Sequence, residues 1–370
     1  MPNTNVQHFA DFVNENIYVG IDVHKKSWAV TIRAFNLQIA HFTQPPSSQT
    51  LAAYLKKNYP KGNYFSVYEA GFFGTTIHEE LTILGVKNII VNPGDIPTTD
   101  KQKKNKTDTH DSRALAEHLE KGSLRGIHIH TRQQQELRAL FRLRTSKSRD
   151  LTRSINKLKG FLIYFGYITQ QSWSHSGSLS KRTLAWLESL NMTTVAGNTA
   201  LKEYIQDILY RRGRLLNTTK QLRLLIQSVY AKSYEYLISV PGIGPIVAMA
   251  LLSEIGDFKR FGDPDQYCSF LGLMPWECSS GETFRTKGVQ PRCNHYLRSL
   301  IIEASWSAIR KEPHWLLYYR KHALQNNKRA IVKVARKLAL TARGVILKQT
   351  FYDPTWYAKG VPMHTIQTTS

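Results

Sequence analysis

The first 120 residues alternate between short β-branched or aromatic runs and stretches of helical periodicity, and this alternation restricts the possible folds most strongly. Strand-like runs lie at 17–23, 28–34, 38–43, 64–70 and 87–91. Helices are predicted from Ser48 to a stop at 60–62, over 77–85, and over the segment DTHDSRALAEHLEKG. Successive strands followed by alternating helices and strands predict an α/β layer fold.

Carboxylates occupy special positions in this region. Asp22 ends the first predicted strand, Glu69 ends the fourth, and Asp108 and Asp111 share one face near a helix start. Hard cations prefer oxygen ligands, and two Mg²⁺ ions ~3.5–4 Å apart can hold the attacking and leaving oxygens of a phosphodiester. The four acids therefore predict a Mg²⁺ (or Mn²⁺) site. Taken singly, each has a plainer alternative, such as a helix cap, a solvated first turn or a surface position.

The charge balance points to a polyanionic partner. Fifty Lys and Arg against 27 Asp and Glu leave a net charge of +23, which favours nucleic acid. The longest aliphatic run, 246–252, is far shorter than the ~20 residues that span a bilayer. The N-terminus lacks a signal-peptide layout, and the three cysteines have no CxxC spacing. We therefore expect a cytoplasmic protein without membrane contact, disulfide framework or thiolate zinc site.

The middle of the chain is basic and helical. Residues 131–160 hold nine Lys and Arg but two acids, along a discontinuous apolar stripe. After a Ser-rich interval at 170–182, apolar residues recur with heptad-like spacing at Ile205, Ile208, Leu215, Leu222 and Ile226. This pattern predicts a helical hairpin or coiled coil that mediates dimer formation. Its basic face is predicted to bind phosphates, with a solvated surface as the alternative, through Arg138, Arg142, Arg149 and Arg153.

A Pro–Gly–Ile–Gly turn at 241–244 leads into an apolar helix. Glycines permit close backbone approach, and amides at a helix start attract phosphate. The turn resembles the hairpin of a helix-hairpin-helix element, so Gly242 and Gly244 are candidates for phosphate contact. Simple packing is the alternative.

Several motifs together resemble one protein family. GIDVHKKS (20–27), VYEAG (67–71) and NKTDTHDSRALAEHL (105–119) resemble the three acidic motifs of the DEDD insertion-sequence transposases, the IS one-ten group. The order GLMP…SSG…R…N..LRSL..EA within 261–306 is similar to the C-terminal domain of that group. The resemblance implies an α/β ribonuclease-H-like (RuvC-like) domain, a helical coiled-coil connector, a mainly α C-terminal domain and a tail, which we assign to 15–125, 126–232, 233–350 and 351–370.

The resemblance also implies a chemistry. Asp22, Glu69, Asp108 and Asp111 would be Mg²⁺ ligands, and Ser280 would be the nucleophile that forms a serine–DNA phosphodiester. Arg285 and Lys287 would neutralise the phosphate oxygens. Family membership implies cutting and rejoining of double-stranded donor and target DNA by a homodimer or tetramer. In some members a structured guide (bridge) RNA pairs with both DNAs, and the basic helices here would then hold such an RNA.

Two other functions remain open at this point. A RuvC-like nuclease or junction resolvase would use Mg²⁺-activated water, so its cleavage would need Asp22 but not Ser280. An inactive copy would only bind nucleic acid, in a salt-sensitive manner that EDTA leaves unchanged. Retention of all four acids together with the serine argues against the inactive copy.

Overall fold

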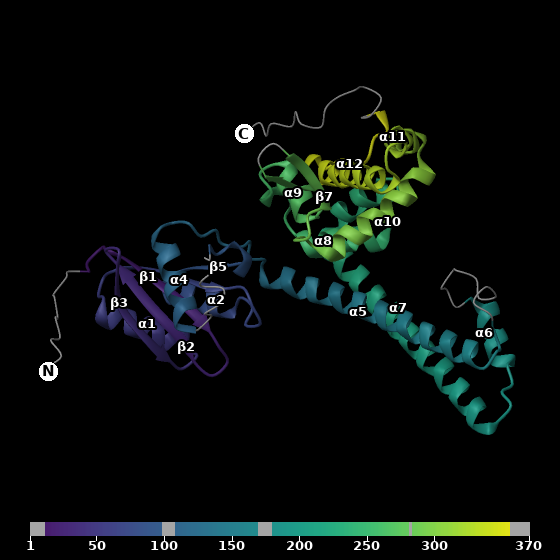
Figure 1. The fold of residues 1–370 in the computed structure, drawn as a ribbon, viewed down its shortest axis with the longest axis horizontal. Helices are drawn as coiled ribbons and strands as arrows, with labels where there is room; N and C mark the ends of the chain where they lie inside the picture. Colours follow the sequence, from purple (N-terminus) through teal and green to yellow (C-terminus); the bar gives the residue numbers. More distant parts are fainter. Residues whose placement is uncertain (1–11, 98–107, 169–179, 281–282, 356–370) are drawn as a thin grey trace. The chain divides into compact units, whose positions relative to one another are not determined.

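The computed structural model describes residues 12–97, 108–168, 180–280 and 283–355, but not the side chains of 108–110, 277–280 and 283–287. The chain forms two compact units that divide between Ile129 and His130 (Figure 1). The two long helices of the middle region thus fall in one unit with the C-terminal helices. The division into three domains stays a prediction.

A five-stranded mixed sheet forms the centre of the first unit. Its strands are β1 (Asn16–Val23), β2 (Trp28–Ala34), β3 (Leu37–Gln44), β4 (Asn63–Glu69) and β5 (Lys87–Val91). Their order is β3-β2-β1-β4-β5. Strand β1 is antiparallel to β2 and parallel to β4, and β4 is parallel to β5. The predicted α/β layer fold of this region is confirmed.

Helices cover both faces of the sheet. On one face, Ile17, Val19 and Ile21 of β1 share a buried cluster with residues of α1 (Ser48–Asn58) and α2 (Thr76–Ile83). On the other face, Val67 of β4 contacts Leu115 of α4 (Asp108–Glu120). A 3₁₀ turn, η1 (Pro93–Asp95), follows β5. Because successive strand residues point to opposite faces, each strand position is assigned to the α1/α2 face or to the α4 face.

Helix α4 lies directly on β1 because of Gly20. A Cβ atom at Gly20 would lie 2.1 Å from the carbonyl oxygen of Ser112 and 2.5 Å from the nitrogen of Ala116. No side chain fits there, so glycine is required for this close approach. Two polar contacts also attach α4 to the neighbouring strand β2. The hydroxyls of Thr31 and Ser112 lie 2.9 Å apart and buried, and Arg33 Nε donates to Glu120 at 2.6 Å.

Two long helices begin the second unit, α5 (Arg132–Tyr164) and α7 (Val195–Ser239), with the short α6 (Lys181–Ser189) between them. Figure 1 shows α5 and α7 side by side. Ile205 and Ile208 of α7 share a cluster with Ile155 of α5, and Leu222 joins Phe141 in another. The predicted heptad-like seam is therefore used within the chain. The helical hairpin is confirmed, whereas a coiled coil between copies stays a prediction.

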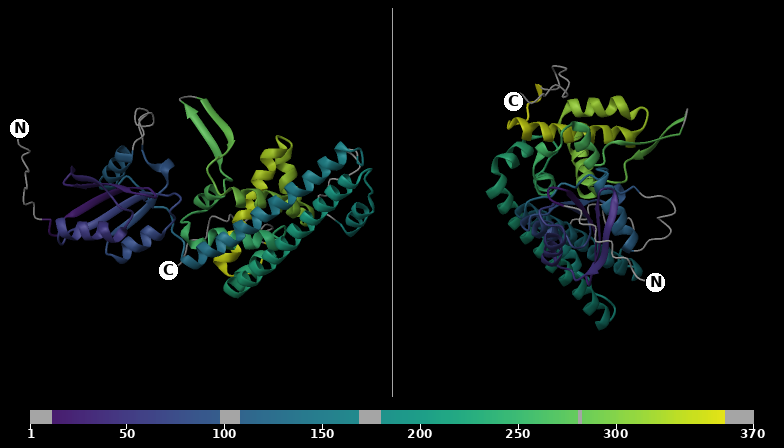
Figure 2. Two further views of the ribbon diagram at one scale, coloured as in Figure 1. Left: turned by 90° about the horizontal axis from the view of Figure 1, so that it is seen from below. Right: turned by 90° about the vertical axis from the view of Figure 1, so that its left-hand side faces the viewer.

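The remaining helices contribute to the same buried cluster as α8 (Pro245–Ile255), whose residues from Val247 onward are all buried. They are η2 (Phe258–Arg260), α9 (Pro264–Phe270), α10 (His295–Lys311), α11 (Pro313–Ala323) and α12 (Asn327–Lys348). The predicted, mostly helical character is confirmed, but the β6–β7 hairpin (Pro275–Ser280 and Thr283–Val289) was not predicted. In Figure 2 this hairpin stands out from the helices of its unit. Across the described residues, the apolar stretches of the helices are too short for a bilayer crossing.

Candidate active site

Asp22 and Glu69 lie at the same end of two adjacent parallel strands. The register pairs Gly20 with Val67 and Ile21 with Tyr68, so Asp22 and Glu69 are the next residue on each strand. Ile21 and Tyr68 belong to the cluster on the α1/α2 face. By alternation, Asp22 and Glu69 face α4. The fold thus brings together two carboxylates that are 47 positions apart in the sequence.

Helix α4 carries the other two predicted ligands to this face. Asp111 is partly buried and immediately precedes Ser112, whose backbone lies against Gly20 of β1. Asp108 is the first residue of α4, one turn before Asp111. The side chain of Asp108 lies outside the described residues, so only its backbone position is known. The packing of α4 on β1 therefore sets the position of both aspartates relative to Asp22.

A histidine that is not among the predicted site residues stands beside Asp22. His24 Nε2 lies 3.1 Å from Asp22 Oδ2, and the side chains of His24 and Asp22 are 50 % and 19 % exposed. The signal was present in the sequence, because residues two apart at a strand end point the same way. His24 thus places a ring nitrogen within hydrogen-bond distance of a predicted metal ligand.

The donor set fits a hard divalent cation in kind, because all four groups are carboxylates and they belong to one end of one sheet face. Among the side chains that the structure describes, no group of three or more His, Cys, Asp or Glu is close enough to hold an ion. Asp22, Glu69 and Asp111 are among these side chains and do not form such a group, whereas the side chain of Asp108 is not described. The metal site stays a prediction.

Ser280 is the last residue of β6 and pairs with Thr283 of β7. On β7, Arg285 pairs with Cys278, and Lys287 lies two residues further along. The side chains of Ser280, Arg285 and Lys287 lie outside the described residues. The serine thus belongs to an antiparallel hairpin of the second unit, and the four acids belong to the first unit.

The two glycines of the Pro–Gly–Ile–Gly turn have different surroundings. Gly242 has φ +92°, and a Cβ there would lie 2.4 Å from the carbonyl oxygen of Ala304 and 2.8 Å from the nitrogen of Ala308. It is therefore required for packing on α10. Gly244 caps α8, and a Cβ there would meet no atom within 4 Å. Phosphate contact by either residue stays a prediction.

Arg138 and Arg142 bind an internal carboxylate. Glu254 of α8 is fully buried and accepts from Arg138 Nε at 2.9 Å and Arg142 Nε at 2.7 Å. Asn294 Nδ2 also donates to it at 2.8 Å, and Asn294 caps α10 through Leu297 N. Burial raises the pKa of Glu254, but the hydrogen bond from Arg142 and the charges of both arginines outweigh it, so this pKa lies below its ordinary value. These two arginines have a structural role, and their predicted nucleic-acid contact stays a prediction.

The other two predicted α5 arginines are more exposed. Arg153 lies 3.3 Å from Asp150 in a solvated i,i+3 pair. The guanidinium carbon of Arg149 lies 5.4 Å from the ring centroid of Tyr296 on α10, and that of Arg142 lies 5.0 Å from the same ring. Contact of Arg149 and Arg153 with nucleic acid stays a prediction.

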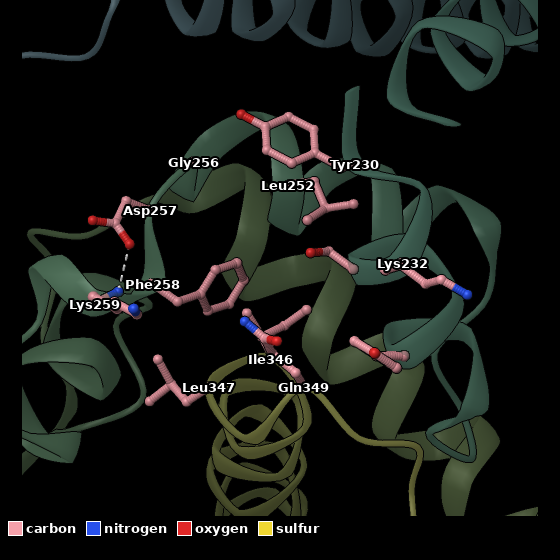
Figure 3. A pocket seen from close by; sticks show the side chains of 12 residues that line it. Tyr230, Lys232, Leu252, Gly256, Asp257, Phe258, Lys259, Ile346, Leu347 and Gln349 are labelled. Carbon is pink, nitrogen blue, oxygen red and sulfur yellow. Dashed lines mark hydrogen bonds between the residues drawn. The ribbon is translucent and has the colours of Figure 1, made fainter. Parts of the chain in front are cut away.

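A cavity of about 340 Å³ opens in the second unit where α7 is kinked and where α8 and α12 end (Figure 3). Tyr230, which is non-helical within α7, lines one side, and Gly256 and Gln349 mark the ends of α8 and α12. Figure 3 also shows Asp257, which accepts from Lys259 N at 2.8 Å. None of the predicted site residues line this cavity, and its lining carries charges of both signs.

Two family models match the chain. Residues 19–165 match the model DEDD_Tnp_IS110, described as "Transposase", and residues 234–320 match "Transposase IS116/IS110/IS902 family". The first match contains all four acids, and the second contains Ser280. Similar curated proteins carry related names.

A putative transposase of Sinorhizobium fredii is 27 % identical over 78 % of this chain and 71 % of its own length. A probable family 20 transposase of Pseudomonas aeruginosa is 27 % identical over 68 % of this chain and 75 % of its length. The transposase for insertion sequence element IS1111A of Coxiella burnetii is 25 % identical over 73 % of this chain and 74 % of its own length. The similarity thus extends through most of each protein.

Proposed function

Because the chain belongs to the IS110 family of insertion-sequence transposases, we propose that it cuts and rejoins DNA through a transient bond between Ser280 and a DNA phosphate. The observation that carries the proposal is the convergence of Asp22, Glu69 and the start of α4 on one sheet face. The sheet order, with α4 on the face opposite α1 and α2, supports a ribonuclease-H-like first domain.

Asp22, Glu69, Asp108 and Asp111 would hold Mg²⁺ or Mn²⁺. A bound ion of this kind stabilises the negative charge that develops on the phosphate oxygens in the transition state. The chain's own contribution is to fix the ligands, since Gly20 and the Thr31–Ser112 contact set the position of α4. His24, 3.1 Å from Asp22, would orient that carboxylate or accept a proton beside it.

In the proposed step, the Oγ of Ser280 forms a bond to phosphorus while the bond from phosphorus to one sugar oxygen breaks. The serine proton leaves to a base, and the departing sugar hydroxyl gains a proton. Attack by a sugar hydroxyl of a second strand then reverses the exchange and frees the serine, so the number of phosphodiester bonds is conserved. Arg285 and Lys287, on the strand paired with β6, would neutralise the phosphate oxygens.

Rejoining two duplexes requires more than one serine, which supports a homodimer or tetramer as the working form. We also propose that a structured guide RNA selects the donor and target DNA, as the family resemblance implies. The net charge of +23 supports a protein that holds more than one nucleic acid.

Capture of the covalent intermediate tests the proposal. The protein is incubated with Mg²⁺, with DNA that carries the ends of its insertion sequence and with any RNA that co-purifies with it. Protein–DNA adducts are then separated on a denaturing gel. We expect an adduct with the wild type and none with Ser280→Ala. Ser279→Ala, which changes the neighbouring serine, is the control and should still form the adduct. An adduct that persists in Ser280→Ala contradicts the serine assignment. If Ser280→Ala cleaves normally and Asp22→Asn does not, the protein is a metal-dependent nuclease that uses water.

A further inference from the structure

The six arginines of α5 divide into two groups by their partners. Arg138 and Arg142 bind Glu254, Arg132 pairs with Glu136, and Arg153 pairs with Asp150. Arg144 and Arg149 differ, because within the described part of the chain no carboxylate oxygen lies within 4 Å of either guanidinium. These two therefore retain charge that no ion pair neutralises.

Arg144 is partly buried, yet its hydrogen bond is a long one, from Nε to Thr219 Oγ1 at 3.4 Å. Burial lowers its pKa, because the charged guanidinium has lost part of its hydration. A cation in such a position is stabilised when an anion binds beside it.

Arg144 and Arg149 line the same groove, which has a volume of about 200 Å³ and runs between α5 and α10. We call it the α5/α10 groove. Its lining consists of Arg144, Thr145, Ser148, Arg149, Tyr296, Ser299 and Leu300. None of these seven side chains is acidic, and four carry a hydroxyl group. The groove thus combines two cations with hydrogen-bonding groups and excludes negative charge from its walls.

Tyr296 gives the groove an aromatic wall. Its ring lies next to the guanidinium groups of Arg142 and Arg149 and beside Leu300. A flat ring next to cations suits a nucleotide, because the base or sugar packs on the ring while the phosphate meets the arginines. A small inorganic anion would use the cations but not the ring.

We propose that the α5/α10 groove binds a phosphodiester of a nucleic-acid strand, with Arg144 and Arg149 on the phosphate and Tyr296 against the adjoining sugar or base. The inference rests on the proposed function for the class of ligand, nucleic acid, but not on strand cleavage. DNA and RNA share the phosphodiester, and the experiment distinguishes them.

Arg149→Gln tests the proposal, because this side chain is exposed and its replacement leaves the core intact. Binding of fluorescent duplex DNA, single-stranded DNA and single-stranded RNA is measured by anisotropy in EDTA, which prevents cleavage, between 50 and 200 mM salt. One lost phosphate contact should lower the slope of log K against log[salt] by about 0.7–0.9 for at least one of the three probes. Affinity at the lower salt should fall roughly three-fold or more for that probe.

Arg132→Gln is the matched control. Arg132 lies on the same helix, loses the same charge on substitution, and pairs with Glu136 outside the groove. It should leave the salt slope unchanged. Tyr296→Leu should weaken binding of the affected probe without changing the slope. If Arg149→Gln and Arg132→Gln give equal affinities and slopes for all three probes, the proposal is wrong, whether or not Ser280 forms an adduct.

Discussion

Asp22 and Glu254 are both carboxylates on apolar elements, but their surroundings are opposite. Glu254 is fully buried and receives hydrogen bonds from Arg138, Arg142 and Asn294. Asp22 stands at a strand end, is 19 % exposed and lies beside a half-exposed histidine. The difference shows that a carboxylate neutralised inside a core holds helices together. One that shares a sheet face with other acids suits a cation from solution.

The largest effect is expected from Asp22→Asn, which removes a ligand charge and keeps the shape. Strand cleavage should fall about a thousand-fold, since metal stabilisation of transition-state charge amounts to several kcal/mol. Cleavage of labelled DNA and the thermal midpoint are measured together, and the midpoint should stay within about 2 °C of the wild type. A cleavage rate of Asp22→Asn within ten-fold of the wild-type rate would show that Asp22 is not a metal ligand needed for cleavage.

Glu254→Ala should affect stability instead. It leaves Arg138, Arg142 and Asn294 without their shared acceptor, which should lower the free energy of unfolding by about 3 kcal/mol, measured by urea denaturation. Glu136→Ala is the control, because its pair with Arg132 is solvated on both sides and should contribute under about 0.5 kcal/mol. Equal losses in the two variants would remove the distinction between the internal and surface carboxylates.

Gly20→Ala should damage both stability and the acid site. The new Cβ would overlap the backbone of α4 and displace the helix that carries Asp108 and Asp111. We expect a loss of about 2 kcal/mol in unfolding free energy, together with weaker divalent-ion binding by calorimetry. Gly160→Ala in α5 is the control, since no atom lies within 4 Å of its Cβ position, and it should be neutral or stabilising. If Gly20→Ala binds divalent ions with the affinity of the wild type, the packing of α4 on β1 does not set the position of the metal ligands.

The smallest effect concerns pH. The pKa of Glu254 is depressed in the folded protein, so its contribution to stability is present above the unfolded pKa, near 4.5, and is lost as pH falls through the folded value. The thermal midpoint of the wild type should therefore fall more steeply below pH 4.5 than that of Glu254→Gln. Parallel midpoint curves for the two proteins below pH 4.5 would contradict this assignment.

Local sequence pattern predicted the first unit well. The strand-like runs 17–23 and 64–70 correspond to β1 and β4, and the long connection between them, through β2, β3 and α1, allows their parallel pairing. The role of Gly20 was less visible, because its requirement comes from contact with Ser112, 92 positions later.

The second unit was harder to predict because its contacts are long-range. Arg138 and Arg142 belong to a basic run that predicts a phosphate-binding face, but their partner Glu254 lies more than 100 positions away in an apolar helix. The β6–β7 hairpin was also missed, although Thr283, Phe284 and Val289 are strand-forming residues.

Direct measurement of ion binding distinguishes the two carboxylate settings most clearly. Mn²⁺ is titrated into the wild type, Asp22→Asn and Glu254→Gln at a temperature where all three are folded, and free Mn²⁺ is followed by its electron paramagnetic resonance signal. We predict that Asp22→Asn binds at least ten-fold more weakly than the wild type, whereas Glu254→Gln binds equally well. Wild-type affinity in Asp22→Asn would contradict a cation site on the α4 face of the sheet.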